Sequence, residues 1–301
     1  MSYMVPGFPR FKPLELSDKR SIDKKNIHGY SDFTFASLWC WNTHNDFSIS
    51  LLNKNLVVKM RDYTSHKPIL TFLGANNLSD TIYNLLYISK SMGEKSLHLV
   101  PEHNINGDKY IFGKYIFDLD RNQFDYIYLV REISTLSGGK YHKKRHLASR
   151  FEKLYSPEVK LLNLKNKYNQ RQMVYVWHKW LEKRNKDYKD YRDEAIAIQK
   201  AFMLDYKMIS LGIFIENQLV AFNMGEIYPN KISMILFQKT DPTYHGITEY
   251  LMKKTCDLYL KKGALYLNFM QDVGEPGLRL AKNLWRPVKF LKKYKIYPGQ
   301  E

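Results

Sequence analysis

Cysteine is nearly absent from this chain of 301 residues. Cys40 and Cys256 are its only cysteines, too few for a disulfide framework or a cysteine metal cluster. No apolar run reaches the roughly 18 to 20 residues that cross a bilayer, and the first residues lack the apolar stretch of a signal peptide. We therefore expect a cytoplasmic protein without a transmembrane segment or a metal site, and we leave open a peripheral position at a membrane.

Acidic residues are also in short supply. The sequence has 30 Asp and Glu against 47 Lys and Arg, which gives a net charge of +17. Such a charge attracts polyanions through its summed field, although a lysine-rich surface also keeps a protein soluble. The hydrophobic fraction of 44% and the aromatic fraction of 15% exclude a disordered chain.

A weak internal repeat organises the sequence. Residues 50–60 and 214–224 each contain an apolar run, a polar turn and a second apolar run, the pattern of a β-hairpin. Hydrophobic spacing then predicts a strand, a helix and a strand after each hairpin, at 69–73, 79–92 and 96–100 in the first copy and at 232–237, 247–261 and 264–269 in the second. We therefore expect an α/β fold with mixed sheets, built from two similar domains, residues 1–150 and 151–301, with helices over 172–183 and 192–204 opening the second.

A turn of polar residues leads into the second repeat's helix. The N–H groups at a helix start suit a phosphate or carboxylate, which makes Tyr244, His245 and Gly246 candidates for cofactor binding. The order of elements resembles GCN5-related N-acetyltransferase (GNAT) domains, whose coenzyme A pyrophosphate loop is glycine-rich at this point. Ile247 and Thr248 stand where a second small residue would follow, which counts against ordinary coenzyme A binding.

The most specific stretch is the end of the second repeat. A strand ends in Asn268, and after it come Asp272 and a turn with Gly274 and Gly277. A loop at a strand end can aim polar groups at a ligand. The predicted substrate-binding residues of this segment are Gly274, Gly277, Leu278, Arg279 and Lys282.

This stretch resembles the C-terminal domain family of bacterial phosphatidylglycerol lysyltransferases, with its pattern close to Asn-x-Glu-x-Asp-x-Gly-x-x-Gly-Leu-Arg-x-Ala-Lys. Further matches at 33–41, 125–128 and 150–151 extend the resemblance over nearly the whole chain. It implies two tandem acyltransferase-like domains, related to enzymes that move an aminoacyl group from charged tRNA onto a lipid or peptidoglycan amine or hydroxyl.

One position departs from that pattern. Met270 stands where the family has Glu, so a carboxylate that could bind a donor ammonium or move a proton is absent there. Asp272 or Glu226 could take over that task. The catalytic candidates are therefore Asp272, Asn268 and Glu226.

A basic stretch, GGKYHKKRH, occupies residues 138–146. A solvated helix over 140–153 would account for it, but its charges fall in the first turns, where the helix dipole disfavours cations. We therefore favour a site for phosphate of a tRNA acceptor end, a lipid headgroup or a cofactor. Its predicted residues are Lys140, His142, Lys143, Lys144 and Arg145.

The leading functional hypothesis is an acyltransferase that uses aminoacyl-tRNA. Direct transfer is expected, because neither cysteine stands in a recognisable nucleophile setting. An N-acyltransferase that uses acyl-coenzyme A and a non-catalytic module that binds RNA or a membrane surface remain alternatives. The sequence does not name the transferred group, the acceptor or the oligomeric state.

Overall fold

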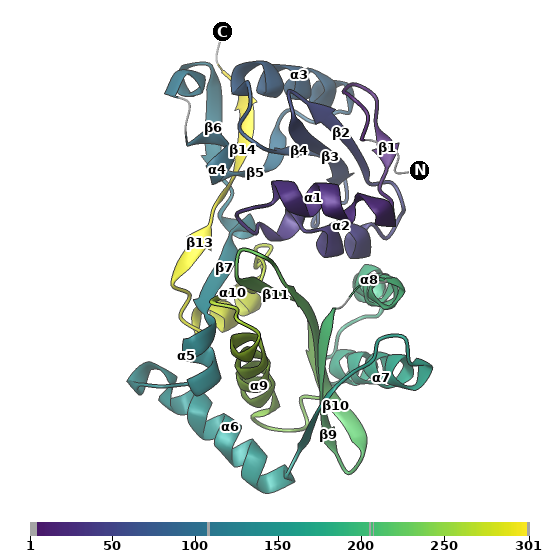
Figure 1. The fold of residues 1–301 in the computed structure, drawn as a ribbon, viewed down its shortest axis with the longest axis vertical. Helices are drawn as coiled ribbons and strands as arrows, with labels where there is room; N and C mark the ends of the chain where they lie inside the picture. The colour runs from purple at the N-terminus through teal and green to yellow at the C-terminus, as the bar shows by residue number, and fades with distance from the viewer. Residues whose placement is uncertain (1–4, 107–108, 205, 207, 300–301) are drawn as a thin grey trace. The chain divides into compact units, whose positions relative to one another are not determined.

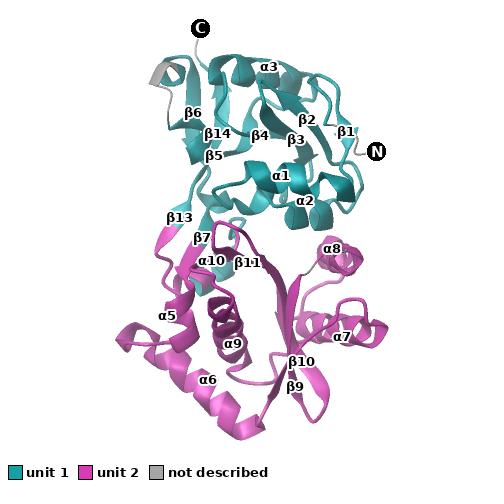
Figure 2. Cartoon of the chain, viewed as in Figure 1, with its two compact units in different colours: residues 1–126, 271–281, 290–301 teal, residues 127–270, 282–289 magenta. Residues whose placement is uncertain are grey.

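The computed structural model describes residues 5–106, 109–204, 206 and 208–299, shown in Figure 1. The chain forms two compact units, coloured separately in Figure 2. Unit 1 comprises Met1–Tyr126, Gln271–Ala281 and Phe290–Glu301, and unit 2 comprises Ile127–Met270 and Lys282–Lys289. The predicted boundary between residues 150 and 151 falls inside helix α6 (His142–Tyr155).

Unit 1 carries two small sheets. The first has the order β1-β2-β3-β4 and the second the order β5-β14-β6. Its strands are β1 (Lys12–Pro13), β2 (Ser48–Leu52), β3 (Asn55–Arg61), β4 (Pro68–Leu73), β5 (Leu97–Pro101), β6 (Tyr115–Leu119) and β14 (Lys293–Pro298). Its α-helices are α1 (Lys19–Lys25), α2 (Phe35–Trp41), α3 (Leu78–Ser91) and α4 (Glu102–Ile105), with 3-10 turns at Leu16–Asp18, Ser31–Phe33, Lys109–Gly113 and Arg121–Gln123.

The core of unit 1 joins both sheets to α3. Val57, Phe72 and Leu85 are buried in one apolar cluster with Ile296, which comes from β14 at the far end of the sequence. Since β14 pairs on one side with β5 and on the other with β6, the C-terminal strand completes this unit.

Unit 2 is built on one mixed sheet. Its strand order is β13-β7-β12-β11-β10-β9-β8, and β7 and β13 each continue across the division between the units. The strands are β7 (Asp125–Leu129), β8 (Glu158–Leu161), β9 (Ile209–Ile215), β10 (Gln218–Ile227), β11 (Ile232–Thr240), β12 (Tyr266–Asn268) and β13 (Lys289–Leu291). The helices are α5 (Val130–Thr135), α6, α7 (Lys167–Lys183), α8 (Arg192–Met203), α9 (Ile247–Lys261) and α10 (Pro276–Asn283, which also crosses the division), with 3-10 turns at Gly139–Tyr141 and Lys189–Tyr191.

The helices of unit 2 cover opposite faces of its sheet. In Figure 1, α9 lies on one side of β10 and β11 and α7 lies on the other. Met173, Val176 and Trp177 of α7 are buried, as their helical spacing predicted. Helix α6 packs against the side of α9 that faces away from the sheet, through Phe151 and Tyr250, whose ring centroids lie 5.1 Å apart.

The predicted order of elements is observed in both units. Strands β2, β3 and β4, helix α3 and strand β5 follow one another in unit 1, as β9, β10, β11, α9 and β12 do in unit 2. The two hairpins even share a turn, since Asn53-Lys54 and Glu216-Asn217 are each two residues with positive φ. A mixed α/β fold is confirmed. No helix in the described ranges is both long and apolar enough to cross a membrane.

Candidate functional site

Strands β11 and β12 part at the middle of the unit 2 sheet. They pair in parallel at three positions, the last joining Met234 to Asn268, while β11 runs on to Thr240. The Asn268 side-chain oxygen accepts the N–H of Met270 at 2.7 Å, and Met270 has a φ of 57°, so the chain turns away where β12 ends. In the described part of the chain, no other strand pairs with β11 on that side beyond Met234.

The side chain of Lys282 holds the turn that follows β12. Its ammonium donates to the carbonyl oxygens of Phe269 and Met270 and lies 4.6 Å from the centroid of the Phe269 ring. Lys282 is only 5% exposed. The predicted substrate-binding lysine therefore fixes the backbone of the turn in this structure.

A β-bulge lies next to the parting strands. Gly225 pairs with Ile235 and Met224 pairs with Phe237, so Leu236 is an extra residue in β11. A Cβ on Gly225 would lie 2.0 Å from the Met234 carbonyl oxygen, so only glycine fits this close approach. Bulges redirect backbone groups, and this one lies two residues beyond the last pair with β12.

One row of side chains crosses the sheet at the same place. Glu226 of β10, Met234 of β11 and Asn268 of β12 are register partners, so their side chains share one face. That face is turned away from α9, because the neighbouring Gly225 faces the hydroxyl of Tyr259 on α9. Both polar residues were predicted as catalytic, and the structure brings them into this row.

The carboxylate of Glu226 is buried and oriented. Glu226 is 5% exposed, and the hydroxyl of Tyr228 donates to its Oε2 at 2.5 Å. Sequence analysis did not identify Tyr228, although strand alternation places residues i and i+2 on one face and could have found it.

Asp272, the third catalytic candidate, lies in unit 1 and is fully buried. It accepts hydrogen bonds from Arg121 Nη1 (3.1 Å), Tyr126 OH (2.6 Å), Arg279 Nε (3.0 Å) and Arg279 Nη2 (2.9 Å), and from the N–H of Gly274 (2.9 Å). Burial alone would raise the pKa of Asp272, but the hydrogen bonds from Arg279, Tyr126 and Gly274 lower it to about 2. Asp272 therefore stays ionised and is suited to anchoring arginines rather than to accepting a proton near neutral pH.

The two arginines held by Asp272 keep part of their surface in solvent. The side chains of Arg121 and Arg279 are 37% and 35% exposed. The Arg121 guanidinium lies over the rings of Phe124, Tyr126 and Phe290, at 4.9 to 5.5 Å from their centroids. Two fixed, half-exposed guanidinium groups form a candidate anion contact in unit 1. Sequence analysis missed Arg121, because 151 positions separate it from Asp272.

The remaining residues of the predicted loop surround Arg279. Gly274 has a φ of 83°, and Asn122, whose side-chain oxygen accepts from Arg279 Nη2 at 2.6 Å, lies beside it. Gly277 and Leu278 lie on the exposed first turn of α10. The predicted substrate-binding role of these residues stays a prediction.

Some side chains of the basic stretch, residues 138–146, bond to other groups of the protein, and others do not. Lys140 pairs with Glu132 at 2.6 Å, and Arg145 Nη1 donates to the carbonyl oxygens of Leu136 at 2.5 Å and Gly138 at 3.2 Å, closing the end of α5. These two residues therefore stabilise the start of α6 from within the protein.

Lys144 is also engaged within unit 2. It lies 3.6 Å from a carboxylate oxygen of Glu249 and 3.9 Å from the centroid of the Trp285 ring, and burial lowers its pKa. His142 and Lys143, by contrast, are exposed. Lys140, although paired with Glu132, also has an exposed side chain, so three of the five predicted residues are exposed and Lys144 and Arg145 are not.

The backbone of α6 packs directly against the turn before α9. Gly246 has a φ of 90°, and a Cβ there would lie 2.4 Å from the Leu147 carbonyl oxygen of α6. Tyr244 packs edge-on against Tyr155 at 5.1 Å, while His245 is exposed. Gly246 is thus required for the approach of α6, and the carbonyl oxygen beside it would repel a phosphate.

The described side chains do not indicate a metal site. No group of three or more His, Cys, Asp and Glu in them could hold a metal ion.

One family model matches most of this chain. The family model described as "Phosphatidylglycerol lysyltransferase, C-terminal" matches residues 25–297. An uncharacterized protein of Mycoplasmoides gallisepticum is 23% identical over 175 residues, which cover 57% of this chain and 55% of that protein. The chain thus spans about half the length of this curated relative.

Two solved structures share the fold over nearly the whole chain. A conserved protein of unknown function from Bacteroides thetaiotaomicron is similar with a TM-score of 0.81 and 21% identity, covering 98% of this chain and 100% of that one. The L-PGS of Bacillus licheniformis is similar with a TM-score of 0.62 and 15% identity, covering 93% of each chain. The predicted acyltransferase-like fold class is confirmed.

Proposed function

Because the chain belongs to the family described as phosphatidylglycerol lysyltransferase, C-terminal, we propose that it is an aminoacyltransferase. It takes an aminoacyl group from aminoacyl-tRNA and transfers it to an amine or hydroxyl of a lipid or another acceptor. The observation that carries this proposal is the row of Glu226 and Asn268 at the parting of β11 and β12.

The chemistry is transfer of an acyl group from an ester. The acceptor oxygen or nitrogen attacks the ester carbonyl carbon, its proton passes to Glu226, and the tetrahedral intermediate collapses. The bond from the carbonyl carbon to the ribose oxygen breaks, and the proton returns to that oxygen. Backbone N–H groups of β11 near the Leu236 bulge are the proposed donors to the oxyanion.

Glu226 is the proposed proton acceptor because the alternatives are unsuited. Met270 replaces the family's glutamate, and Asp272 is held by two arginines with its pKa at about 2. Glu226 is buried, oriented by Tyr228 and aligned with Asn268. General base catalysis by a positioned carboxylate contributes typically about 100-fold or more to a rate.

Aminoacyl-tRNA is the proposed donor rather than acyl-coenzyme A. The support is the turn before α9, where Gly246 faces the Leu147 carbonyl oxygen and no second glycine follows. A pyrophosphate there would meet an acceptor oxygen in place of an N–H group.

A screen of donors tests this proposal. Purified protein is incubated with a pool of tRNAs charged with radiolabelled amino acids and with phosphatidylglycerol vesicles or soluble amines, and label in the acceptor is measured. We expect label to pass to one acceptor class. Titration calorimetry with acetyl-coenzyme A runs in parallel, and a micromolar binding signal there without transfer from any tRNA would replace this proposal with the coenzyme A alternative.

A further inference from the structure

The charge of this protein is concentrated in one unit. Unit 2 contains 28 Lys and Arg against 14 Asp and Glu, a net charge of +14, whereas unit 1 contains 19 against 16, a net charge of +3. Nearly all the excess therefore belongs to the unit that carries the row of Glu226 and Asn268. A polyanion would be attracted to unit 2 rather than to unit 1.

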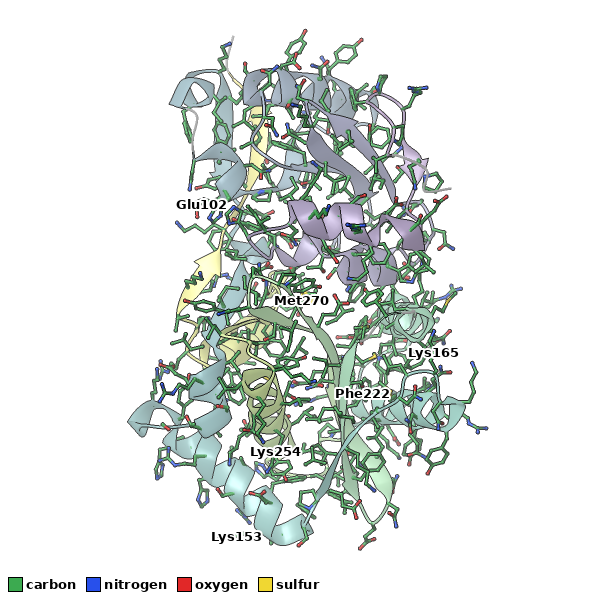
Figure 3. The ribbon with its side chains drawn as sticks, viewed as in Figure 1. Glu102, Lys153, Lys165, Phe222, Lys254 and Met270 are labelled. Carbon is green, nitrogen blue, oxygen red and sulfur yellow. The ribbon has the colours of Figure 1, made fainter. Side chains whose placement is uncertain are left out.

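Within unit 2, one face of α6 gathers exposed basic residues. At 100° per residue, the outward sector of this helix holds five of them: His142, Lys143, His146, Arg150 and Lys153. All five side chains are exposed, and Figure 3 labels Lys153 near the end of the helix. We call this set the α6 basic face.

Among the residues that the structure describes, no acidic side chain is paired with the α6 basic face. The single carboxylate of the helix, Glu152, projects from its flank and is bound by Lys254 at 3.0 Å and by the Tyr250 hydroxyl at 3.3 Å. Ion pairs between described residues use Lys140 and Lys144 instead, and none of them uses a residue of this face. The fold thus pairs Lys140, in the turn before the helix, and Lys144, within the helix, and leaves the α6 basic face to solvent.

This arrangement works against the stability of the helix. Lys143 lies in the first turn, where the helix dipole disfavours positive charge. Arg150 and Lys153 are three residues apart, a spacing at which side chains on a helix are neighbours and like charges repel. An anion lying along the helix would offset these costs.

The chemistry of the face favours a nucleic-acid backbone over a membrane. A helix that lies in a membrane surface exposes a broad apolar stripe, but the apolar Ala148 and Phe151 of α6 are buried and only Leu154 is exposed on the outward sector. From residue 142 to 153 the helix rises about 16 Å at 1.5 Å per residue. That length can follow several phosphates of one nucleic-acid strand.

We propose that the α6 basic face binds the phosphate backbone of RNA and holds the body of the tRNA donor away from the reacting ester. This rests on the proposed function for the identity of the RNA. Helix α9 covers one face of the sheet, as the hydrogen bond from Asn223 of β10 to Thr255 of α9 shows, and α6 lies outside α9. Because the row of Glu226 and Asn268 is on the opposite face, α9 and then the sheet lie between it and α6. Layer spacings of roughly 8 to 10 Å place the face about 20 Å from that row.

Two charge-matched variants test the proposal. The first is Lys143→Gln, Arg150→Gln and Lys153→Gln together, and the second is Lys167→Gln, Arg171→Gln and Lys183→Gln on α7, whose side chains are also exposed. Binding of purified total tRNA is measured against salt concentration. We expect the α6 variant to bind about tenfold or more weakly near 0.1 M salt, with a log–log salt slope smaller by about 2 to 3, and the α7 variant to change less than about twofold.

Several outcomes would overturn the proposal. An equal loss in the two variants would mean that charge acts without a defined surface, and no loss in the α6 variant would mean that RNA does not lie there. If the α6 variant lost binding to vesicles of phosphatidylglycerol and phosphatidylcholine but retained tRNA binding, the face would be assigned to a membrane.

Transfer assays separate this inference from the proposed function. With an aminoacylated dinucleotide as donor, which is too short to reach α6, we expect the α6 variant to match the unsubstituted protein, whereas with full-length tRNA its KM should rise at unchanged kcat. If the α6 variant and the unsubstituted protein transfer equally well from the dinucleotide and from full-length tRNA, the proposal for the α6 basic face is overturned and the proposed function is not. Tight tRNA binding that depends on α6, with no transfer to any acceptor, overturns the proposed function alone.

Discussion

At the scale of single residues, unit 1 buries charges that are matched by partners far away in the sequence. Asp272 is bound by Arg121 and Arg279, and Lys293 lies between Asp32 and Asp125 with no exposed side-chain surface on any of the three. Each group is stable as an ion only because its partners are fixed. Substitutions at these residues therefore test the geometry directly.

The pKa of Asp272 predicts how its contribution to stability depends on pH. A carboxyl with a pKa of about 2 in the folded state and an ordinary value of 3.8 in the unfolded state stabilises the fold above pH 4, by about 2 kcal/mol. This stabilisation is lost as the pH falls from about 4 to about 2. We expect the difference in unfolding free energy between the original protein and Asp272→Asn, measured with urea, to shrink over that range. A difference that is constant from pH 6 to pH 2 would contradict the assigned pKa.

A second prediction concerns the buried Lys293. Burial alone would lower its pKa, but the charges of Asp125 and Asp32 raise it, so the ammonium stays protonated. Lys293→Met removes the cation that lies between two buried carboxyl groups and should cost about 3 to 5 kcal/mol of unfolding free energy. Lys292→Met, which removes only a surface pair with Glu102, should leave the unfolding free energy nearly unchanged. Equal losses in the two variants, measured by chemical denaturation, would refute this account of the buried cluster.

At the scale of elements, hydrophobic periodicity was sufficient to place the long helices. The expected helix over 247–261 coincides with α9, and the helix expected over 79–92 is α3 (Leu78–Ser91). What periodicity could not predict is the pairing of lysines around the start of α6, where Lys140, in the preceding turn, pairs with Glu132 and Lys144 pairs with Glu249. Glu249 lies more than 100 residues along the chain, so the sequence could not separate the structural lysines from the exposed ones.

The approach of α6 to α9 can be tested at Gly246. Gly246→Ala adds a Cβ 2.4 Å from the Leu147 carbonyl oxygen at a φ of 90°. Gly263 has nearly the same φ, 86°, but a Cβ added there meets no atom within 4 Å. Gly263→Ala therefore measures the cost of the left-handed backbone alone, about 1 to 2 kcal/mol of unfolding free energy. We expect Gly246→Ala to cost at least about 1 kcal/mol more than Gly263→Ala. Equal midpoints in thermal and urea unfolding would mean that α6 does not pack closely there.

At the scale of the whole molecule, the chain returns to its first unit at its end. Strand β14 pairs with β5 and β6 after almost 200 intervening residues. The sequence could not predict this return, because local patterns report order along the chain and carry no signal for such distant pairing. The duplication of the hairpin, strand, helix and strand was predictable, since it is visible within each half.

The row of Glu226 and Asn268 illustrates the same limit. Sequence analysis selected Asn268 from a motif and Glu226 as a substitute for a missing carboxylate, but it could not place them on one face. Their alignment depends on the register of β10, β11 and β12, which only the folded sheet provides. The sequence also could not distinguish Asp272, which is held by arginines, from a carboxylate available for proton transfer.

The central claim is that this protein transfers an aminoacyl group with Glu226 as the proton acceptor. Its most direct test is the single-turnover rate of transfer from charged tRNA to the acceptor that the donor screen identifies, in the original protein, in Glu226→Gln and in the control Glu216→Gln, whose side chain is exposed in the turn between β9 and β10. We predict a loss of about 100-fold or more for Glu226→Gln, with tRNA binding retained and the control unchanged. Transfer at the original rate by Glu226→Gln would contradict this account.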